Sequence, residues 1–209
     1  MKIVLATRNN HKTREIEALF KDADIHILSL KDFPNISDIV EDTDSFEGNA
    51  LKKARAVAEY TKKIVMADDS GLQVDALNGK PGVYSSRYAG ENASDEENNK
   101  KLLNEMKDIP FEKRSARYKC VIAVVFPSGE EKIAEGECNG FIAFEPKGNY
   151  GFGYDPIFYV PEYNKTMAEI SPEEKNKISH RARAIQNIKR QSCGFDKSNP
   201  YKKCRGSIH

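Results

Sequence analysis

Two adjacent carboxylates follow a short apolar run in the segment KKIVMADDSGLQVDAL, residues 62–77. We expect residues 64–67 to form a buried strand that ends in a polar turn at Asp68 and Asp69. Carboxylates at the end of a strand can hold Mg²⁺ and orient a water molecule. The same residues also suit a solvated turn in which an aspartate caps nearby N–H groups.

The alternation of a strand limits what this pair can do. If both aspartates lie within the strand, their side chains point to opposite faces and cannot both contact one metal ion. Only one of them can then hold the metal and the water; if it is Asp69, the other has a separate role. Asp68 then either reaches the site through the twist of the turn or holds a lysine such as Lys53 from the other face.

Two further polar segments suit a phosphate and metal site. TRNNHK, residues 7–12, lies between an expected strand and helix, where backbone N–H groups favour anions and Lys12 adds positive charge. The alternative is a polar loop with a surface lysine. Glu41 and Asp42 add carboxylates that suit a hard cation, and the alternative for them is a solvated loop.

Aromatic and cationic residues supply what binding a flat base would require. Phe152 or Tyr154 can stack on a base, within the glycine-rich segment GNYGFGYDPIF at residues 148–158. Lys175, His180 and Arg181 suit a phosphate or a base edge. The alternatives are an aromatic turn packed in the core and a structural histidine. Arg87 is a further loop cation, which an ion pair on the surface would also explain.

Strands and helices alternate along the chain, which predicts an α/β fold. The patterns indicate strands at 2–6, 25–30 and 64–67, helices at 12–21, 46–63 and 94–107, a hairpin of 117–126 and 133–138 that 140–144 extends, and a final helix from 172 that breaks near 179. We expect a single two-lobed domain over residues 1–190 and a loosely ordered tail over residues 191–209.

Composition excludes several classes of protein. The net charge of +1 provides no field that would favour DNA, RNA or an anionic membrane, so we expect no nucleic-acid or membrane partner. No apolar run approaches the roughly 20 residues that span a bilayer. The four cysteines lack the spacing of a zinc site, and without an export signal we expect reduced thiols in a cytoplasmic protein.

Five motifs in this order resemble the inosine triphosphate pyrophosphatase family, over about residues 2–190. They are TxNxxK at 7–12, ADDSGL at 67–72, PGVYSSRYAG at 81–90, GFGYDPIF at 151–158 and EKxxISHR at 174–181. The resemblance implies an α/β fold of two lobes around a long twisted mixed sheet with flanking helices, and an active site in the cleft between the lobes. It also implies a Mg²⁺-dependent homodimer that hydrolyses ITP, dITP and XTP to the monophosphate and pyrophosphate.

The resemblance also assigns roles to individual residues. It implies Asp69 as the catalytic base, and Glu41 with Asp69 as the metal ligands, Asp42 being the alternative to Glu41. We expect Asp68 to help Asp69 in catalysis. The substrate positions that we expect are Thr7, Arg8, Asn9, Asn10, His11, Lys12, Ser70, Arg87, Phe152, Gly153, Tyr154, Asp155, Lys175, His180 and Arg181.

Two other functions remain open at this point. A nucleotide-binding module without turnover would use the same phosphate loop, although carboxylates at 41 and 69 argue against it. A phosphohydrolase that cuts the γ-phosphate would release orthophosphate instead of pyrophosphate.

Overall fold

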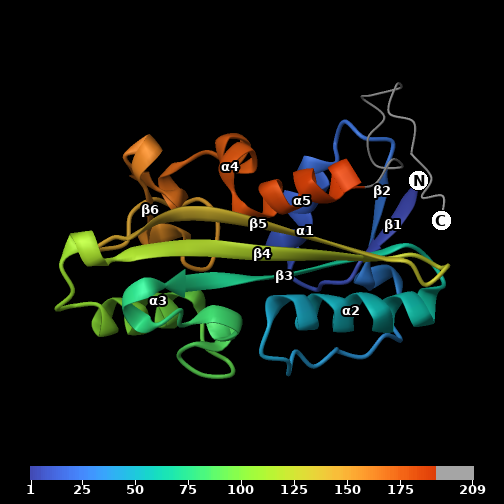
Figure 1. Cartoon of the computed structure of the whole chain (residues 1–209), viewed down its shortest axis with the longest axis horizontal. Helices are drawn as coiled ribbons and strands as arrows, with labels where there is room; N and C mark the ends of the chain where they lie inside the picture. Colours follow the sequence, from blue (N-terminus) through green and yellow to red (C-terminus); the bar gives the residue numbers. More distant parts are fainter. Residues whose placement is uncertain (192–209) are drawn as a thin grey trace, which may run out of the picture.

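A single mixed sheet runs the length of the molecule (Figure 1). The computed structural model describes residues 1–191, in which seven strands are ordered β2-β1-β3-β4-β5-β6-β7. They are β1 (Lys2–Leu5), β2 (His26–Ser29), β3 (Val65–Val74), β4 (Ser115–Val125), β5 (Glu131–Ile142), β6 (Phe158–Val160) and β7 (Lys165–Thr166). β1 pairs in parallel with β2 and β3, whereas the pairs from β3 to β7 are antiparallel.

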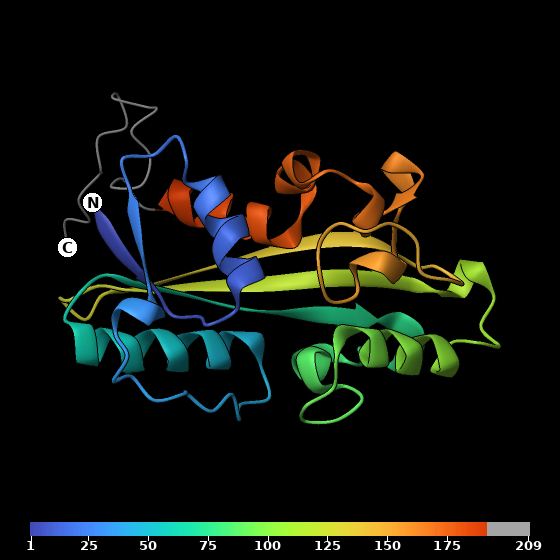
Figure 2. The same cartoon turned by 180° about the vertical axis from the view of Figure 1, so that it is seen from behind.

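Helices cover both faces of this sheet. They are α1 (Asn10–Leu19), α2 (Phe46–Thr61), α3 (Asp95–Glu105), α4 (Pro172–Ile178) and α5 (His180–Gln191). In Figure 1, α1, α4 and α5 lie above the sheet and α2 and α3 lie below it, and Figure 2 shows the same two layers from behind. The predicted α/β class with a mixed sheet and flanking helices is confirmed.

The prediction for the segment around Asp68 and Asp69 was wrong. β3 does not end there but continues to Val74, because it pairs with β4 at every residue, including Asp68 with Ile122 and Asp69 with Val121. The polar composition of DDSG is typical of a turn, but ten residues of antiparallel pairing outweigh that local preference. The two aspartates therefore lie in mid-strand.

Most of the other expected elements are present. The capping box at Ser94 and Glu97 begins α3, and the final helix breaks at Ser179, whose backbone is extended, into α4 and α5. β5 is one continuous strand through residues 133–142. The short strands β6 and β7 were not predicted. The predicted tail, residues 191–209, lies outside the described residues, except for Gln191 at the end of α5.

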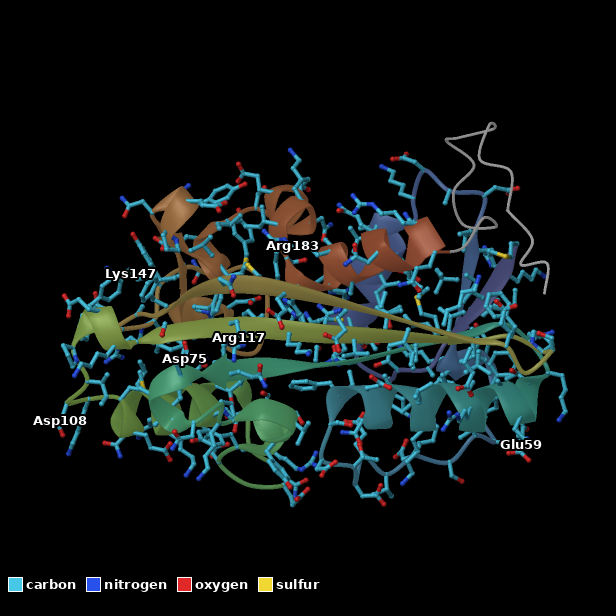
Figure 3. All side chains as sticks on the ribbon, viewed as in Figure 1. Glu59, Asp75, Asp108, Arg117, Lys147 and Arg183 are labelled. Carbon is cyan, nitrogen blue, oxygen red and sulfur yellow. The ribbon has the colours of Figure 1, made fainter. Side chains whose placement is uncertain are left out.

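Side chains fill the space between the sheet and both helix layers (Figure 3). On the α2 side, Val65 and Ala67 of β3 pack with Ala54 and Val57. On the α5 side, Met66 packs in a separate cluster with residues that include Ile185. Even-numbered residues at the start of β3 thus face α1 and α5, and odd-numbered residues face α2. In residues 1–191, no helix is long and apolar enough to span a membrane.

Candidate active site

The site is built along the edge of β3 that β1 leaves unpaired. β1 pairs with β3 at Val65 and Met66 and then diverges, whereas β4 pairs along the whole strand. Side chains bond the exposed edge instead: Lys53 Nζ donates to the Asp68 carbonyl at 2.7 Å, and Ser85 Oγ accepts from the Leu72 N–H at 2.9 Å. Groups from both faces of the sheet can therefore meet around one strand edge.

Asp69 faces α2, as its odd position in β3 requires. Asn49 Nδ2 donates to its Oδ2 at 3.2 Å, and Lys53 Nζ donates to its Oδ1 at 3.3 Å. Burial raises the pKa of Asp69 above its usual range, although Lys53 and Lys12 oppose that shift and Glu41 adds to it. A carboxylate with a raised pKa is a better proton acceptor than an exposed aspartate.

Asp68 faces α1 and α5 and has a different environment. It is fully buried, and its Oδ2 lies 3.2 Å from Lys12 Nζ and 3.1 Å from Arg181 Nη2. Burial alone would raise the pKa of Asp68, but Lys12, Arg181 and Lys53 outweigh it and hold the pKa well below its usual range. Asp68 is thus a permanently ionised partner of two cations. The lysine that its carboxylate holds at hydrogen-bond distance is Lys12 and not Lys53.

The two candidates for the second metal ligand are separated by the geometry. Glu41 Oε1 lies 2.6 Å from Lys53 Nζ, the same ammonium that contacts Asp69, and Glu41 lines the pocket described below. Asp42 instead pairs with Lys52 at 2.6 Å, and both side chains are exposed. Glu41 is therefore the acidic residue placed on the side of Asp69.

A second ionic cluster shares Arg181 with the group around Asp68. Lys175 Nζ donates to buried Asp155 and lies 2.8 Å from Glu15, which also pairs with Arg181. Tyr118 donates its hydroxyl to Asp155 Oδ1 at 3.2 Å. These bonds hold Lys175 and Arg181 in place, because each cation has a buried carboxylate partner.

Aromatic rings surround this cluster. Phe152 stacks on His11 with 5.1 Å between ring centroids, and His180 stacks on Tyr118 at 4.6 Å. Burial and the nearby charges of Arg181 and Lys175 lower the pKa of His180 well below its usual range. His180 is therefore neutral near pH 7, with one nitrogen able to donate and the other able to accept.

The loop before α1 differs in part from the expected phosphate cradle. Asn9 caps the helix, and its Oδ1 accepts from the N–H groups of His11 and Lys12 at 2.9 and 3.1 Å. Two of the N–H groups that we expected to face an anion are thus already bonded. The ammonium of Lys12, in the first turn of α1, remains the main positive charge that this segment brings to the site.

One pocket collects most of the predicted site residues. Those that line it are Asn9, Lys12, Glu41, Asp69, Ser70, Phe152, Gly153, Tyr154, Asp155, Lys175, His180 and Arg181. Those outside the lining are Thr7, Arg8, Asn10, His11, Asp68 and Arg87. Arg8 pairs with exposed Asp38 at 2.6 Å, and Arg87 donates to the Glu41 carbonyl at 3.1 Å.

Sequence reasoning named Lys53 only as a possible partner of Asp68 and missed several other polar residues of the site. Lys53 and Asn49 lie on the buried face of α2 beside Ala50 and Ala54, and Glu15 lies three residues after Lys12 on α1. A charged residue within an apolar helical stripe is a signal that could have identified Lys53, because such a residue needs a buried partner. Ser85, Ser86, Asp95 and Tyr118 also line the pocket.

Known proteins resemble this chain along nearly its whole described length. The Ham1 family model matches residues 3–191. A Bacillus cereus protein named dITP/XTP pyrophosphatase is 53% identical over 188 residues, which are 89% of this chain and 92% of the relative.

Solved structures agree with that likeness. A Ham1 protein from Coxiella burnetii is 44% identical with a TM-score of 0.83, and the match covers 91% of this chain and 98% of the other. The Staphylococcus aureus Ham1 protein is also 44% identical, with a TM-score of 0.82 and coverage of 91% and 97%. Sequence and fold thus point to the same group of proteins.

Proposed function

Because this chain belongs to the Ham1 family, we propose that it hydrolyses the non-canonical purine nucleotides ITP, dITP and XTP. The chain is a nucleoside triphosphate pyrophosphatase, and its products are the nucleoside monophosphate and pyrophosphate. The observation that carries this conclusion is 53% identity, along 89% of the chain, to a protein named dITP/XTP pyrophosphatase. We place its work, the removal of such nucleotides from the precursor pool, in the cytoplasm.

Enzymes of this family use a divalent cation, and we propose Mg²⁺ here. Residues 1–191 contain no group of three or more His, Cys, Asp or Glu side chains that could hold a metal ion. The pair of Glu41 and Asp69 still fits Mg²⁺, which commonly binds one or two carboxylates and takes its other ligands from water and phosphates. When bound there, the cation would neutralise phosphate charge and lower the pKa of a water.

The two aspartates divide the chemical work in this proposal. Asp69 accepts the proton of the water that attacks the α-phosphorus. The new bond joins the water oxygen to the α-phosphorus, and the bond to the α–β bridging oxygen breaks, so pyrophosphate leaves. Asp68 keeps Lys12 and Arg181 in place, and Lys12 offsets the charge that develops on the phosphate oxygens.

Base selection follows from hydrogen-bond chemistry near His180. Hypoxanthine and xanthine carry an acceptor oxygen at position 6, where adenine carries an amino donor. Neutral His180 can donate to that oxygen, whereas Arg181 already donates to Asp68, Glu15 and Ser70. With adenine, the donor of His180 would meet the amino donor and stay unpaired, at a cost of roughly 1–3 kcal/mol. That cost corresponds to about 5- to 150-fold discrimination against adenine nucleotides. Phe152 offers a ring for stacking.

A panel of nucleotides tests the proposed function. The protein is incubated with ITP, dITP, XTP, ATP and GTP in the presence of Mg²⁺, and pyrophosphate and orthophosphate are measured separately. We expect pyrophosphate from the first three nucleotides. Orthophosphate as the primary product would instead indicate a γ-phosphate hydrolase, and binding without any product would indicate a nucleotide-binding module.

Exchanging Glu41 for glutamine should weaken the response to metal. We expect the Mg²⁺ concentration for half-maximal activity to rise by at least roughly 10-fold. Metal affinity falls by that much even when a residue that only supports a metal ligand is changed. Asp42→Asn is the matched control, because Asp42 pairs with Lys52 outside the pocket. If the two variants respond to Mg²⁺ alike, Glu41 is not the ligand.

We further propose that the protein is a homodimer that associates through the groove beside α2 and α3. This groove is lined by the start of α2, Val83, Tyr84 and Tyr88, together with Lys119 and Val121 of β4. Tyr84 is 57% exposed, with Arg87 stacked on its ring at 5.2 Å. Tyrosine and arginine are enriched where protein interfaces form.

Tyr84→Asp should therefore halve the molar mass that light scattering measures. The substitution removes the exposed ring and its contact with Arg87, and residues of this type carry much of the binding energy of an interface. Tyr60→Asp serves as the control, since Tyr60 is equally exposed but lies outside the groove. A wild-type protein that is already monomeric at assay concentrations would refute the dimer.

A further inference from the structure

α3 carries two asparagines on the face that packs against the protein. Leu102 and Met106 of this face are fully buried, and Asn98 and Asn99 are only 2% and 6% exposed. Buried amides are unfavourable unless they are hydrogen-bonded, so their partners indicate why they are present.

Asn98 holds one wall of the pocket. Its Oδ1 accepts from the Ala89 N–H at 2.7 Å, and its Nδ2 donates to the Ser86 carbonyl at 3.2 Å. The side chain thus bonds the segment that begins at the 3₁₀ helix η3 (Gly82–Arg87), from which Ser85 and Ser86 line the pocket.

Asn99 and Asp95, the first residue of α3, hold a second wall of the pocket. Asn99 Nδ2 donates to the Gly153 carbonyl at 3.0 Å, and Asp95 Oδ2 accepts from the Gly153 N–H at 2.7 Å. Side chains of α3 therefore bond both the N–H and the carbonyl of Gly153. Gly153 has φ +64°, a conformation that glycine adopts readily and that these two bonds fix.

The two walls are also joined directly. Tyr154, which follows Gly153, donates its hydroxyl to the Ser85 carbonyl at 2.8 Å. The Oδ1 of Asn99 is buried without a hydrogen-bond partner among the described residues. An amide whose oxygen is buried in this way is a poor choice for stability alone, which indicates a role in holding Gly153.

We propose that Asp95, Asn98 and Asn99 form a clamp that sets the distance between these two walls of the pocket and thereby tunes selection among purine bases. The proposal rests on the proposed function. Asn98 and Asn99 are positioning residues, because neither lines the pocket, whereas Gly153 and the flanking Phe152 and Tyr154 do. Small displacements of such groups change selectivity, because base discrimination depends on hydrogen-bond geometry.

Asn99→Leu tests the clamp with little change in side-chain size. It removes the bond to Gly153 and also the unpartnered acceptor, so the fold should tolerate it. We expect the ratio of kcat/KM for dITP to that for dGTP to fall about 10-fold, mainly through a higher KM for dITP. Inhibition by inorganic tripolyphosphate, which has no base, should not change.

Two further variants separate positioning from general stability. Glu97→Ala removes one half of the capping box of α3, in which Glu97 accepts from the Ser94 N–H at 2.7 Å, but touches neither wall, so the ratio should stay at the wild-type value. Asp95 is exposed but itself lines the pocket, so its role in positioning requires two changes together: Asp95→Ala should lower the ratio and speed hydrogen exchange of the Gly153 amide. Asp95→Asn, which keeps an acceptor, should restore both.

The clamp is wrong if Asn99→Leu and Asp95→Ala both fold and keep the wild-type ratio, or if Glu97→Ala lowers the ratio equally. Should Asn99→Leu fail to fold, Asp95→Ala decides alone. Wild-type protein that hydrolyses none of the nucleotides would refute the proposed function instead, and exchange at Gly153 would still report whether the clamp bonds exist.

Discussion

Asp69→Asn should abolish turnover of dITP and leave the fold intact. The amide cannot accept a proton from water and is a weak ligand for a cation, so we expect kcat to fall by at least about 100-fold. Asp69 sits where burial raises its pKa, which means that folding already disfavours its charged form. The neutral amide should therefore cost little stability, and Lys53 keeps its bonds to Glu41 and to the Asp68 carbonyl.

Pyrophosphate release and thermal unfolding, measured on the same samples, check this expectation. Asp75→Asn provides the matched control, because Asp75 directly follows β3 and pairs with Arg117 outside the pocket (Figure 3). Near-normal turnover by the Asp69→Asn protein would show that Asp69 is not the base.

The same substitution one residue earlier should act mainly on stability. Asp68 is fully buried between Lys12 and Arg181, so Asp68→Asn leaves two cations without their shared carboxylate. We expect the free energy of unfolding to fall by about 3 kcal/mol or more. In a domain of this size, that corresponds to a melting temperature roughly 6–12 °C lower.

Urea unfolding measures this difference, and its pH dependence gives a second check. The pKa of Asp68 is lowered in the folded state, so its stabilising effect is present above the usual aspartate pKa of about 3.9. It is lost as the pH falls through the folded-state pKa, so the free energies of unfolding of wild type and variant should converge in acid.

Asp38→Asn is the control. Asp38 forms an exposed pair with Arg8, and its loss should lower the free energy of unfolding by less than about 1 kcal/mol. Equal losses at both positions would contradict the buried network.

The sequence predicted the fold wherever elements are long and periodic. α2 and the hairpin of β4 and β5 have clear apolar patterns, and the caps at Ser94 and Ser171 mark the starts of their helices. β3 was missed beyond residue 67 because strand pairing, which no local pattern shows, decides its length. β6 and β7 are three and two residues long, too short for a period to appear.

The site was predictable where side-chain type alone indicates chemistry, as at Asp69, Lys175 and His180. It was not predictable where a residue matters through its partner. Lys53 joins Glu41 to Asp69, whereas the sequence suggested it only as a partner of Asp68, and Glu15 links Arg181 to Lys175. The alternation of a strand did predict that Asp68 and Asp69 face opposite sides, because that property is purely geometric.

Hydrolysis of dITP in water enriched in ¹⁸O directly tests whether water attacks the α-phosphorus. Attack by water on the α-phosphorus places one ¹⁸O atom in the monophosphate and none in pyrophosphate, and mass spectrometry of both products measures this distribution. We expect label in dIMP alone, in wild-type protein and in the Asp42→Asn control. Label in pyrophosphate, or labelled orthophosphate released before any further hydrolysis, would contradict the proposed reaction.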